Sequence, residues 1–417
     1  MKRRIASWEN GHSQPDEFYG GLLADALGVT ATDLGLTADE APDGFVVAEA
    51  QYPDSSEGAL TTIAGLWQAD LADVPTLTQS PVSDRAWADA SLRWLVSPER
   101  KVPASSHQGG ARVGMADVAM VKATADTFAT LDDRFGGGHA RRAVIQYLSH
   151  DVAPLLHGTY TEAVGRALFA TVAEATLLAG WMSYDAGHHG LAQRYYLHAL
   201  RLAHDAGDRR LAGSVLSAMS HQATFVGRFT DAATLARAAR MGISGVATPT
   251  LMAQFWAMEA RALARTPDHR ATQHALTEAE RFLDRRNHAD EPEWITYFDD
   301  AELSAEAAHC FRDINSAQRS VEHAGNAMSG SHIRSDFFAT MVLADAHLRA
   351  GDIEEACRVA LDALDLGEQL RSARAVSYLA EFRTALTPVQ ANAHVRDLHE
   401  QVSDHRLWTA ADNDLSA

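Results

Sequence analysis

Residues 351–363 read GDIEEACRVALDA, and this stretch decides the predicted fold. Its glycine is followed by alanine at the fifth, ninth and twelfth positions after it. Alanines at this spacing share one face of an α-helix, and their small side chains let a second helix approach closely. The glycine supplies a tight turn before that helix. The stretch therefore predicts a hairpin of two antiparallel helices joined at Gly351.

The same spacing recurs along the chain. Clear copies follow Gly187 (Ala192, Tyr196, Ala199) and Gly227 (Ala232, Ala236, Ala239), and weaker copies start at Arg312 (Ala317, Val321, Ala324), near Thr266 (Ala271, Ala275) and at Gly138 (Ala143, Tyr147). The turns lie about 40 residues apart, within the range of helical-pair repeats. One hairpin cannot bury its apolar face alone, so several must stack. The sequence predicts an all-α fold with an α-solenoid over residues 115–390.

This pattern resembles the tetratricopeptide repeat. Gly180 lies seven positions before Gly187, where that family has a small residue on the first helix, and the alanine triplets match its second-helix contacts. The period is longer than the usual ~34 residues of that family, so extended helices or loops are expected. Armadillo-like helical pairs are the alternative architecture.

In such solenoids the first helix of each pair lines a concave face. Counting back from the turns gives eight candidate ligand-binding residues: Trp181, Tyr184, His221, Trp256, Asp299, Glu302, Glu306 and His309. The last four follow one another at steps of three, four and three, so they share one helical face. Aromatic rings and carboxylates together could hold a peptide or a basic small molecule. The alternative is that the aromatic residues are core and the carboxylates a solvated face.

The N-terminal segment carries a second pattern. A helix is expected to end near Trp8, a second to begin at Pro15, and a short third one to follow Thr32. The residues Ile5, Trp8-Glu9-Asn10-Gly11, Pro15, Leu22-Leu23-Ala24, Leu27-Gly28-Val29 and Leu34 resemble the XRE-type (lambda-repressor-like) helix-turn-helix family. The resemblance makes the first helix the end of a recognition helix and implies that Lys2, Arg3 and Arg4 contact DNA.

That family has two more helices and the start of the recognition helix before this point. We therefore expect residues 1–40 to be a partial helix-turn-helix domain, with DNA as a partner only if upstream sequence completes it. The alternative is a helical cap on the next domain. Residues 41–114 are expected to form a helical linker region, ending in an exposed loop at 97–114. Residues 391–417 are expected to form a C-terminal tail, frayed from residue 400.

Composition restricts the function further. The chain has 417 residues and a formal net charge of −19, so most of its surface repels nucleic acid and any DNA contact must be local. Cys310 and Cys357 have no zinc-ligand spacing, and the 20 histidines show no complete metal pattern. We expect no metal, cofactor or paired nucleophile and base, hence no enzyme. With no signal peptide and no apolar run of membrane-spanning length, the chain is expected to be cytoplasmic.

These features predict a DNA-binding transcriptional regulator whose repeats sense a peptide, small molecule or partner protein. The family resemblance also implies a homodimer. The Ala-, Arg- and Asp-rich composition, with few lysines, resembles that of high-GC actinobacterial proteins. The alternative function is a repeat scaffold for protein–protein interaction without DNA binding.

Overall fold

The computed structural model describes residues 50–97, 111–328, 330 and 332–416. The chain divides into two compact units, residues 1–48 and 49–417. The predicted helix-turn-helix and its residues Lys2, Arg3 and Arg4 lie outside the described residues, as does most of the predicted loop at 97–114. The description that follows concerns the second unit.

The described part of the second unit is helical, and its extended backbone is limited to one isolated bridge between Arg112 and Thr159. It starts with α3 (Ser56–Leu71), α4 (Pro75–Thr78) and α5 (Asp84–Val96). The repeat region holds α6 (Met115–Phe135), α7 (Gly137–Tyr147), a π-helical turn η1 (Leu148–Val152), α8 (Ala153–Leu156), α9 (Glu162–Asp185), α10 (His189–Asp205), α11 (Arg209–Phe225), α12 (Phe229–Gly242), α13 (Pro249–Ala264) and α14 (His269–Leu283). It continues with a 3-10 turn η2 (Glu293–Ile295), α15 (Asp300–Asp313), α16 (Ala317–Asn326), α17 (Ile333–Ala350), α18 (Ile353–Gly367), α19 (Ala373–Leu386), a 3-10 turn η3 (Thr387–Val389), α20 (Ala393–Gln401) and α21 (Arg406–Ser416).

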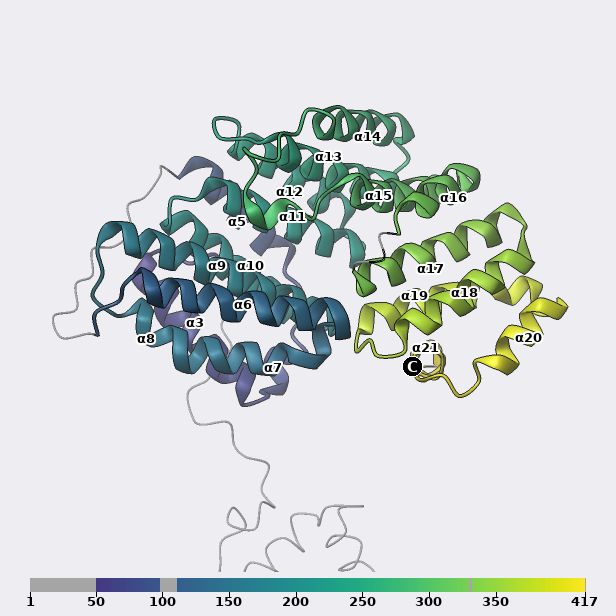
Figure 1. The fold of residues 1–417 in the computed structure, drawn as a ribbon, viewed down its shortest axis with the longest axis horizontal. Coiled ribbons are helices and arrows are strands. Elements are labelled where there is room, and N and C mark those ends of the chain that lie inside the picture. The colour runs from purple at the N-terminus through teal and green to yellow at the C-terminus, as the bar shows by residue number, and fades with distance from the viewer. Residues whose placement is uncertain (1–49, 98–110, 329, 331, 417) are drawn as a thin grey trace, which may run out of the picture. The chain divides into compact units, whose positions relative to one another are not determined.

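The predicted α-solenoid is confirmed. Figure 1 shows the hairpins α13/α14, α15/α16 and α17/α18 following one another along the chain. Gly187, Gly227 and Gly351 form the turns with φ of 87°, 81° and 86°, a left-handed conformation that favours glycine. The residues at the spaced positions after these turns, which are alanines except for Tyr196, are fully buried. Each second helix therefore packs through its alanines, as the spacing predicts.

The weaker copies were placed in the wrong register. In the α15/α16 hairpin the left-handed turn residue is Asn315, with φ of 58°, three positions after Arg312. The buried positions of α16 are accordingly Ser320 and Ala324, and not Ala317. In α14 the predicted Ala275 is buried, but the predicted Ala271 is only partly buried, and Thr272, Leu276 and Ala279 are buried as well. Ala143 of the first copy is exposed. Asparagine tolerates the left-handed region, so a search for glycine missed this turn.

Gly180 shows why a small residue is needed on a first helix. A Cβ atom at this position of α9 would lie 2.5 Å from Cε1 of Tyr196 on α10. Tyr196 is itself fully buried, so its ring has little room to move. The close approach of α9 and α10 therefore depends on this glycine.

The last hairpins of the repeat region contact the first one. The backbone N–H of Arg371 donates to Phe135 O at 2.6 Å, and Gly138 N donates to Arg371 O at 2.9 Å. Beside them, the buried carboxylate of Asp185 accepts from Gly137 N at 2.8 Å and from Ser372 Oγ at 2.9 Å. The turns α6–α7 and α18–α19 are thus hydrogen-bonded to each other, and the first helices of the hairpins surround a common interior.

The helices before the repeats belong to the same packed unit. The region 41–114, predicted to be helical, contains α3 and α5, which pack on α10 and α12 respectively. Trp67, Trp87 and Trp94 are fully buried between these elements. A Cβ atom on Gly242 of α12 would lie 2.0 Å from the Trp94 ring, so the two helices meet closely.

The C-terminal residues are folded, contrary to the expectation of a frayed tail. Leu407 and Trp408 of α21 are buried in the same core cluster as Phe337 and Leu379. The Arg383 guanidinium also lies 4.5 Å from the centroid of the Trp408 ring. The polar composition of this segment concealed a few well-placed apolar residues at helical spacing.

Among the described helices, α9 is long and apolar enough, by length and composition alone, to cross a membrane. This differs from the sequence-based expectation that no such segment exists. In the folded unit, its apolar residues Leu168, Phe169 and Val172 are fully buried among other helices. The composition of α9 is therefore accounted for by its central position in the helical stack.

Candidate functional site

The common interior contains a cavity of about 370 Å³, which we call the central cavity. Its walls come from the first helices of successive hairpins, α6, α9, α11, α13, α15 and α17, together with α19 and the segment before α15. Lining residues include Asp132, Asp133, Leu178, Trp181, Ser217, His221, Gln254, Met258, Arg261, Tyr297, Phe298, Glu302, Glu306, His309, His332, Arg334, Phe338 and Arg374. The repeats thus bring residues that are far apart in sequence to one site.

Five of the eight predicted ligand-binding residues line the central cavity: Trp181, His221, Glu302, Glu306 and His309. They lie on α9, α11 and α15. The rings of Trp181 and His221 meet edge to face, with centroids 5.3 Å apart. Counting back from a repeat turn therefore located the inner face of these three helices.

The other three predicted residues do not line it. Trp256 stacks on Arg240, whose guanidinium carbon is 3.3 Å from the ring centroid. It lies two residues after the lining residue Gln254, which turns its side chain about 200° away. Tyr184 is fully buried, with its ring packed against the Arg374 guanidinium. Asp299 is exposed and caps α15, where its side chain accepts a hydrogen bond from the backbone N–H of Glu302 at 3.0 Å.

Glu306 forms a buried ion pair with Arg261 across α15 and α13. The two side chains are only 8% and 10% exposed. Because an uncompensated buried charge is costly, each of these groups depends on the other. Arg261 was not among the residues predicted from the sequence, although it lies on the face of α13 that also carries Gln254 and Met258.

Glu302 lies one helical turn before Glu306 and behaves differently. Among the described side chains, none forms a hydrogen bond or ion pair with its carboxylate. Burial, reinforced by the charge of Glu306, raises the pKa of Glu302 from 4.5 to about 8. The central cavity therefore contains a carboxyl group whose ionisation would be favoured by a positive charge.

The opposite wall joins α6 to the start of α17. Asp132 is buried and forms an ion pair with Arg334, and Asp133 lies 3.3 Å from Nδ1 of His332. Burial raises the pKa of Asp132 to about 6, although Arg334 opposes the shift. This wall belongs to the same junction that the backbone of Arg371 closes.

Arg374 of α19 forms the third basic contact. Its guanidinium carbon lies 4.6 Å from the Tyr184 ring centroid and 4.5 Å from that of Phe338, and Nη1 is 3.7 Å from Asp185. Arg334 and Arg374 were not among the predicted residues, because the predicted inner face did not extend to the last hairpins.

Two of the lining histidines, His221 and His309, lie deep in the cavity wall and favour the neutral form. Burial, followed by nearby arginines, lowers the pKa of His221 and of His309 well below the usual value. His221 Nδ1 shares a 3.2 Å hydrogen bond with the Tyr184 hydroxyl. Both imidazoles can therefore accept or donate a hydrogen bond without carrying charge.

Several buried polar atoms of the lining residues lack a hydrogen-bond partner among the described residues. They are Asp132 Oδ1, Gln254 Oε1, His309 Nδ1, Arg261 Nε and Arg374 Nε. All five residues are more than nine-tenths buried. A polar ligand that enters the cavity could supply hydrogen-bond partners for these atoms.

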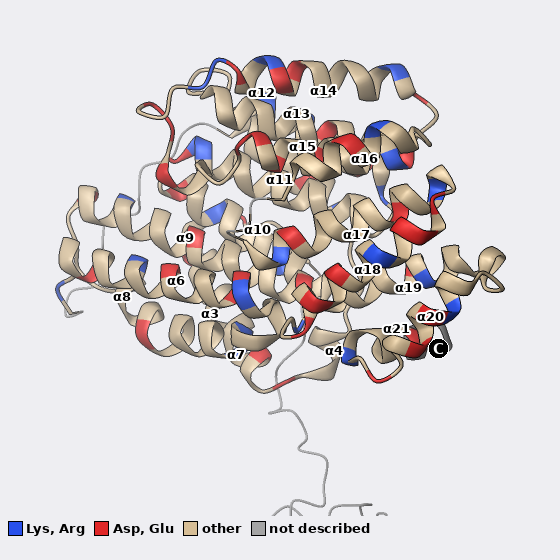
Figure 2. Ribbon diagram, turned by 45° about the vertical axis from the view of Figure 1, so that its right-hand side comes forward, with Lys and Arg blue, Asp and Glu red and all other residues tan. Residues whose placement is uncertain are grey.

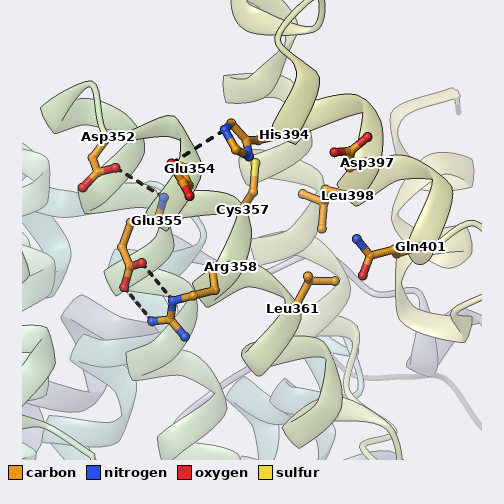
Figure 3. Close-up of a pocket in the computed structure, with 10 residues that line it drawn as sticks. All are labelled: Asp352, Glu354, Glu355, Cys357, Arg358, Leu361, His394, Asp397, Leu398 and Gln401. Atoms are coloured by element: carbon orange, nitrogen blue, oxygen red, sulfur yellow. Dashed lines mark hydrogen bonds and ion pairs between the residues drawn. The ribbon is translucent and has the colours of Figure 1, made fainter.

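A second, shallower pocket lies on the outside, between α18 and α20. Figure 3 shows Glu355 bonded to Arg358 and Glu354 reaching toward His394, with Cys357 and Leu398 at the base. The His394 and Glu354 side chains are 47% and 76% exposed. We call this the surface pocket. Among the described residues, no group of three or more His, Cys, Asp and Glu side chains could hold a metal ion.

Neither a scan against protein-family models nor a search of curated proteins found a match to this chain.

Proposed function

We propose that residues 49–417 are the ligand-sensing part of a DNA-binding transcriptional regulator, with the central cavity as the sensing site. The observation that carries this proposal is the convergence of first helices from consecutive hairpins on one cavity, which is rich in aromatic and charged side chains. At about 370 Å³, the cavity suits a small molecule or a few residues of a peptide. A folded partner protein is far larger.

A sensor also needs a way to transmit occupancy. Asp132, Arg334 and Arg374 line the central cavity and also belong to the junction between the first and last hairpins. A ligand that contacts these side chains would therefore change the free energy of the closed junction. Ligand binding and the arrangement of the hairpins would be coupled through the same residues.

The DNA-binding half of the proposal depends on the resemblance of residues 1–36 to XRE-type domains. Acidic and basic segments are interspersed along the described helices in Figure 2. An N-terminal basic segment on such a protein would act as a local DNA contact, in a dimer that reads two half-sites. We infer a cytoplasmic protein that binds rather than transforms its ligand.

The test is selection of genomic fragments by the full-length gene product at low salt, where phosphate contacts are strongest. We expect a few defined fragments to be retained. The triple variant Lys2→Ala/Arg3→Ala/Arg4→Ala should lose retention while keeping the thermal unfolding of residues 49–417. If no fragment is enriched even at low salt, the regulator proposal is wrong and the scaffold alternative gains.

A further inference from the structure

The acidic side chains that line the central cavity have hydrogen-bond or ion-pair partners among the described residues, with one exception. Arg261 is paired with Glu306, Arg334 with Asp132, and Arg374 lies near Asp185. Asp133 has His332 at 3.3 Å. Glu302 is the remaining carboxyl group, and no described basic side chain pairs with it. A positively charged ligand group could therefore pair with Glu302, whereas the three arginines already have acidic partners.

The same cavity holds a hydrogen-bond acceptor that has no donor among the described residues. Gln254 donates its Nε2 to the Tyr297 hydroxyl at 2.6 Å, which leaves its Oε1 without a donor among the described residues. Glu302 lines the same cavity as these two residues, and its charge adds to the burial that raises the pKa of Tyr297. Gln254 is only 6% exposed, and its free carbonyl oxygen calls for an N–H or O–H donor.

Aromatic side chains also line the cavity. Tyr297 and Phe298 come from the segment before α15, and Trp181 comes from α9. Aromatic faces attract cations, and their area also contacts the apolar part of a ligand. Carboxylate, amide oxygen and aromatic rings are together the usual surroundings of a protonated amine.

From this arrangement we infer that the central cavity binds a small ligand carrying a protonated primary amine, with Glu302 and Gln254 as the groups that recognise the ammonium. Glu302 supplies the charge and Gln254 Oε1 accepts one N–H. A quaternary ammonium has no N–H and cannot satisfy Gln254. An anionic group would meet a carboxyl surface on this side of the cavity. The inference rests on the proposed ligand-binding role of the cavity and specifies the class of ligand.

The test compares four probes of similar shape by isothermal titration calorimetry on the full chain. They are phenethylamine, its N-trimethyl derivative, 2-phenylethanol and 3-phenylpropanoate. We expect phenethylamine to bind at least about tenfold more tightly than the alcohol, because a hydrogen bond to a charged group adds that much. The trimethyl derivative should bind more weakly than the primary amine.

Variants then assign the contacts. Glu302→Gln should reduce the affinity for phenethylamine by about tenfold and leave that for 2-phenylethanol unchanged. Gln254→Met should give a smaller loss, and it also serves if Glu302→Gln misfolds. Glu354→Gln in the surface pocket is the matched control and should bind like the wild type.

The outcomes separate the two proposals. If the alcohol or the carboxylate binds as tightly as the amine, or if Glu302→Gln leaves amine binding unchanged, the amine inference is wrong and the cavity remains a ligand site. If none of the four probes binds at millimolar concentration, the inference and the ligand-binding role of the cavity both fail.

Discussion

The central cavity and the surface pocket are built from the same residue types at different depths. In the cavity, Glu306 pairs with Arg261 and both side chains are at most 10% exposed. In the surface pocket, Glu355 pairs with Arg358, and these side chains are 35% and 57% exposed (Figure 3). Depth changes how much each ion pair contributes to stability. Water screens the outer pair, whereas in the inner pair water cannot replace a lost partner.

Depth also reverses the direction of the pKa shift. Burial raises the pKa of Glu302 to about 8, whereas the hydrogen bond from Arg358 lowers the pKa of Glu355. A glutamate inside the cavity can therefore respond to a ligand near neutral pH. A glutamate in the surface pocket is already ionised there, so it has no comparable response.

The largest expected difference concerns the ion pairs. Arg261→Met leaves Glu306 buried without a partner and should lower the free energy of unfolding by about 3–5 kcal/mol, whereas Arg358→Met should cost less than about 1 kcal/mol. Urea denaturation of both variants measures this. The double variant Arg261→Met/Glu306→Leu should recover most of the loss, because an apolar pair can replace a buried ion pair. Equal effects of the two single variants would contradict the comparison.

A smaller effect is expected in the pH dependence of stability. The Glu302 pKa is higher in the folded state than in the unfolded one, so the folded state binds more protons between about pH 5 and 8, and stability falls as the pH rises. Glu302→Gln removes this loss. It should be more stable than the wild type at high pH by on the order of 1–2 kcal/mol, because partial exposure screens the effect.

This advantage should shrink toward pH 5. The groups that act on Glu302 are Glu306, Asp299, Arg334 and Arg261, and all remain in the variant. Subtracting the wild-type curve also cancels the contributions of Asp132 and Glu174, whose pKa values burial raises to about 6 and 7. Glu354→Gln, with a 76% exposed side chain, should follow the wild type throughout. A constant difference between Glu302→Gln and wild type would show that Glu302 does not titrate in this range.

The smallest effect is expected in thiol chemistry. Cys310 is fully buried in the core beside α13, and Cys357 lies at the base of the surface pocket. Burial raises the pKa of both thiols. Local opening should nevertheless expose Cys357 more often, so iodoacetamide should modify it at least about tenfold faster. Peptide mass spectrometry over time measures the two modification rates. Faster labelling of Cys310 than of Cys357 would contradict the prediction that Cys310 is the less accessible thiol.

The sequence was sufficient for the architecture because the signal is local. A glycine and three alanines at fixed spacing predict a hairpin without knowledge of the rest of the chain. The Asn315 turn shows the limit, since asparagine adopts the same left-handed backbone without matching a glycine pattern. Register, and with it the buried face of α14 and α16, depended on details that the spacing does not contain.

The site was predictable only where one helix carries it. Glu302, Glu306 and His309 share one face of α15, and their spacing reveals this. The ion pairs of the cavity cannot be found from spacing along one helix. Arg261 pairs with Glu306 from a different hairpin, and Arg334 pairs with Asp132 across the junction of the first and last hairpins. The prediction that Trp256 lines the cavity was wrong, because a shift of two positions along α13, from Gln254 to Trp256, moves the side chain from the interior face to the exterior face. Such pairings follow from the curvature of the stack, which sequence spacing does not specify.

The hydrogen bonds between Arg371 and the α6–α7 turn have a consequence for how the chain folds. A linear array of hairpins can assemble from any starting point, because every contact is with the next repeat. Contacts between residues 371 and 135 or 138 are instead distant in sequence and can form only after the intervening hairpins have stacked. These contacts are therefore expected to form last. The amide hydrogens of Arg371 and Gly138 should accordingly exchange with solvent before those of α10. A mutation that destabilises any one hairpin should therefore also weaken these contacts, so that the stacked hairpins unfold cooperatively and not one by one.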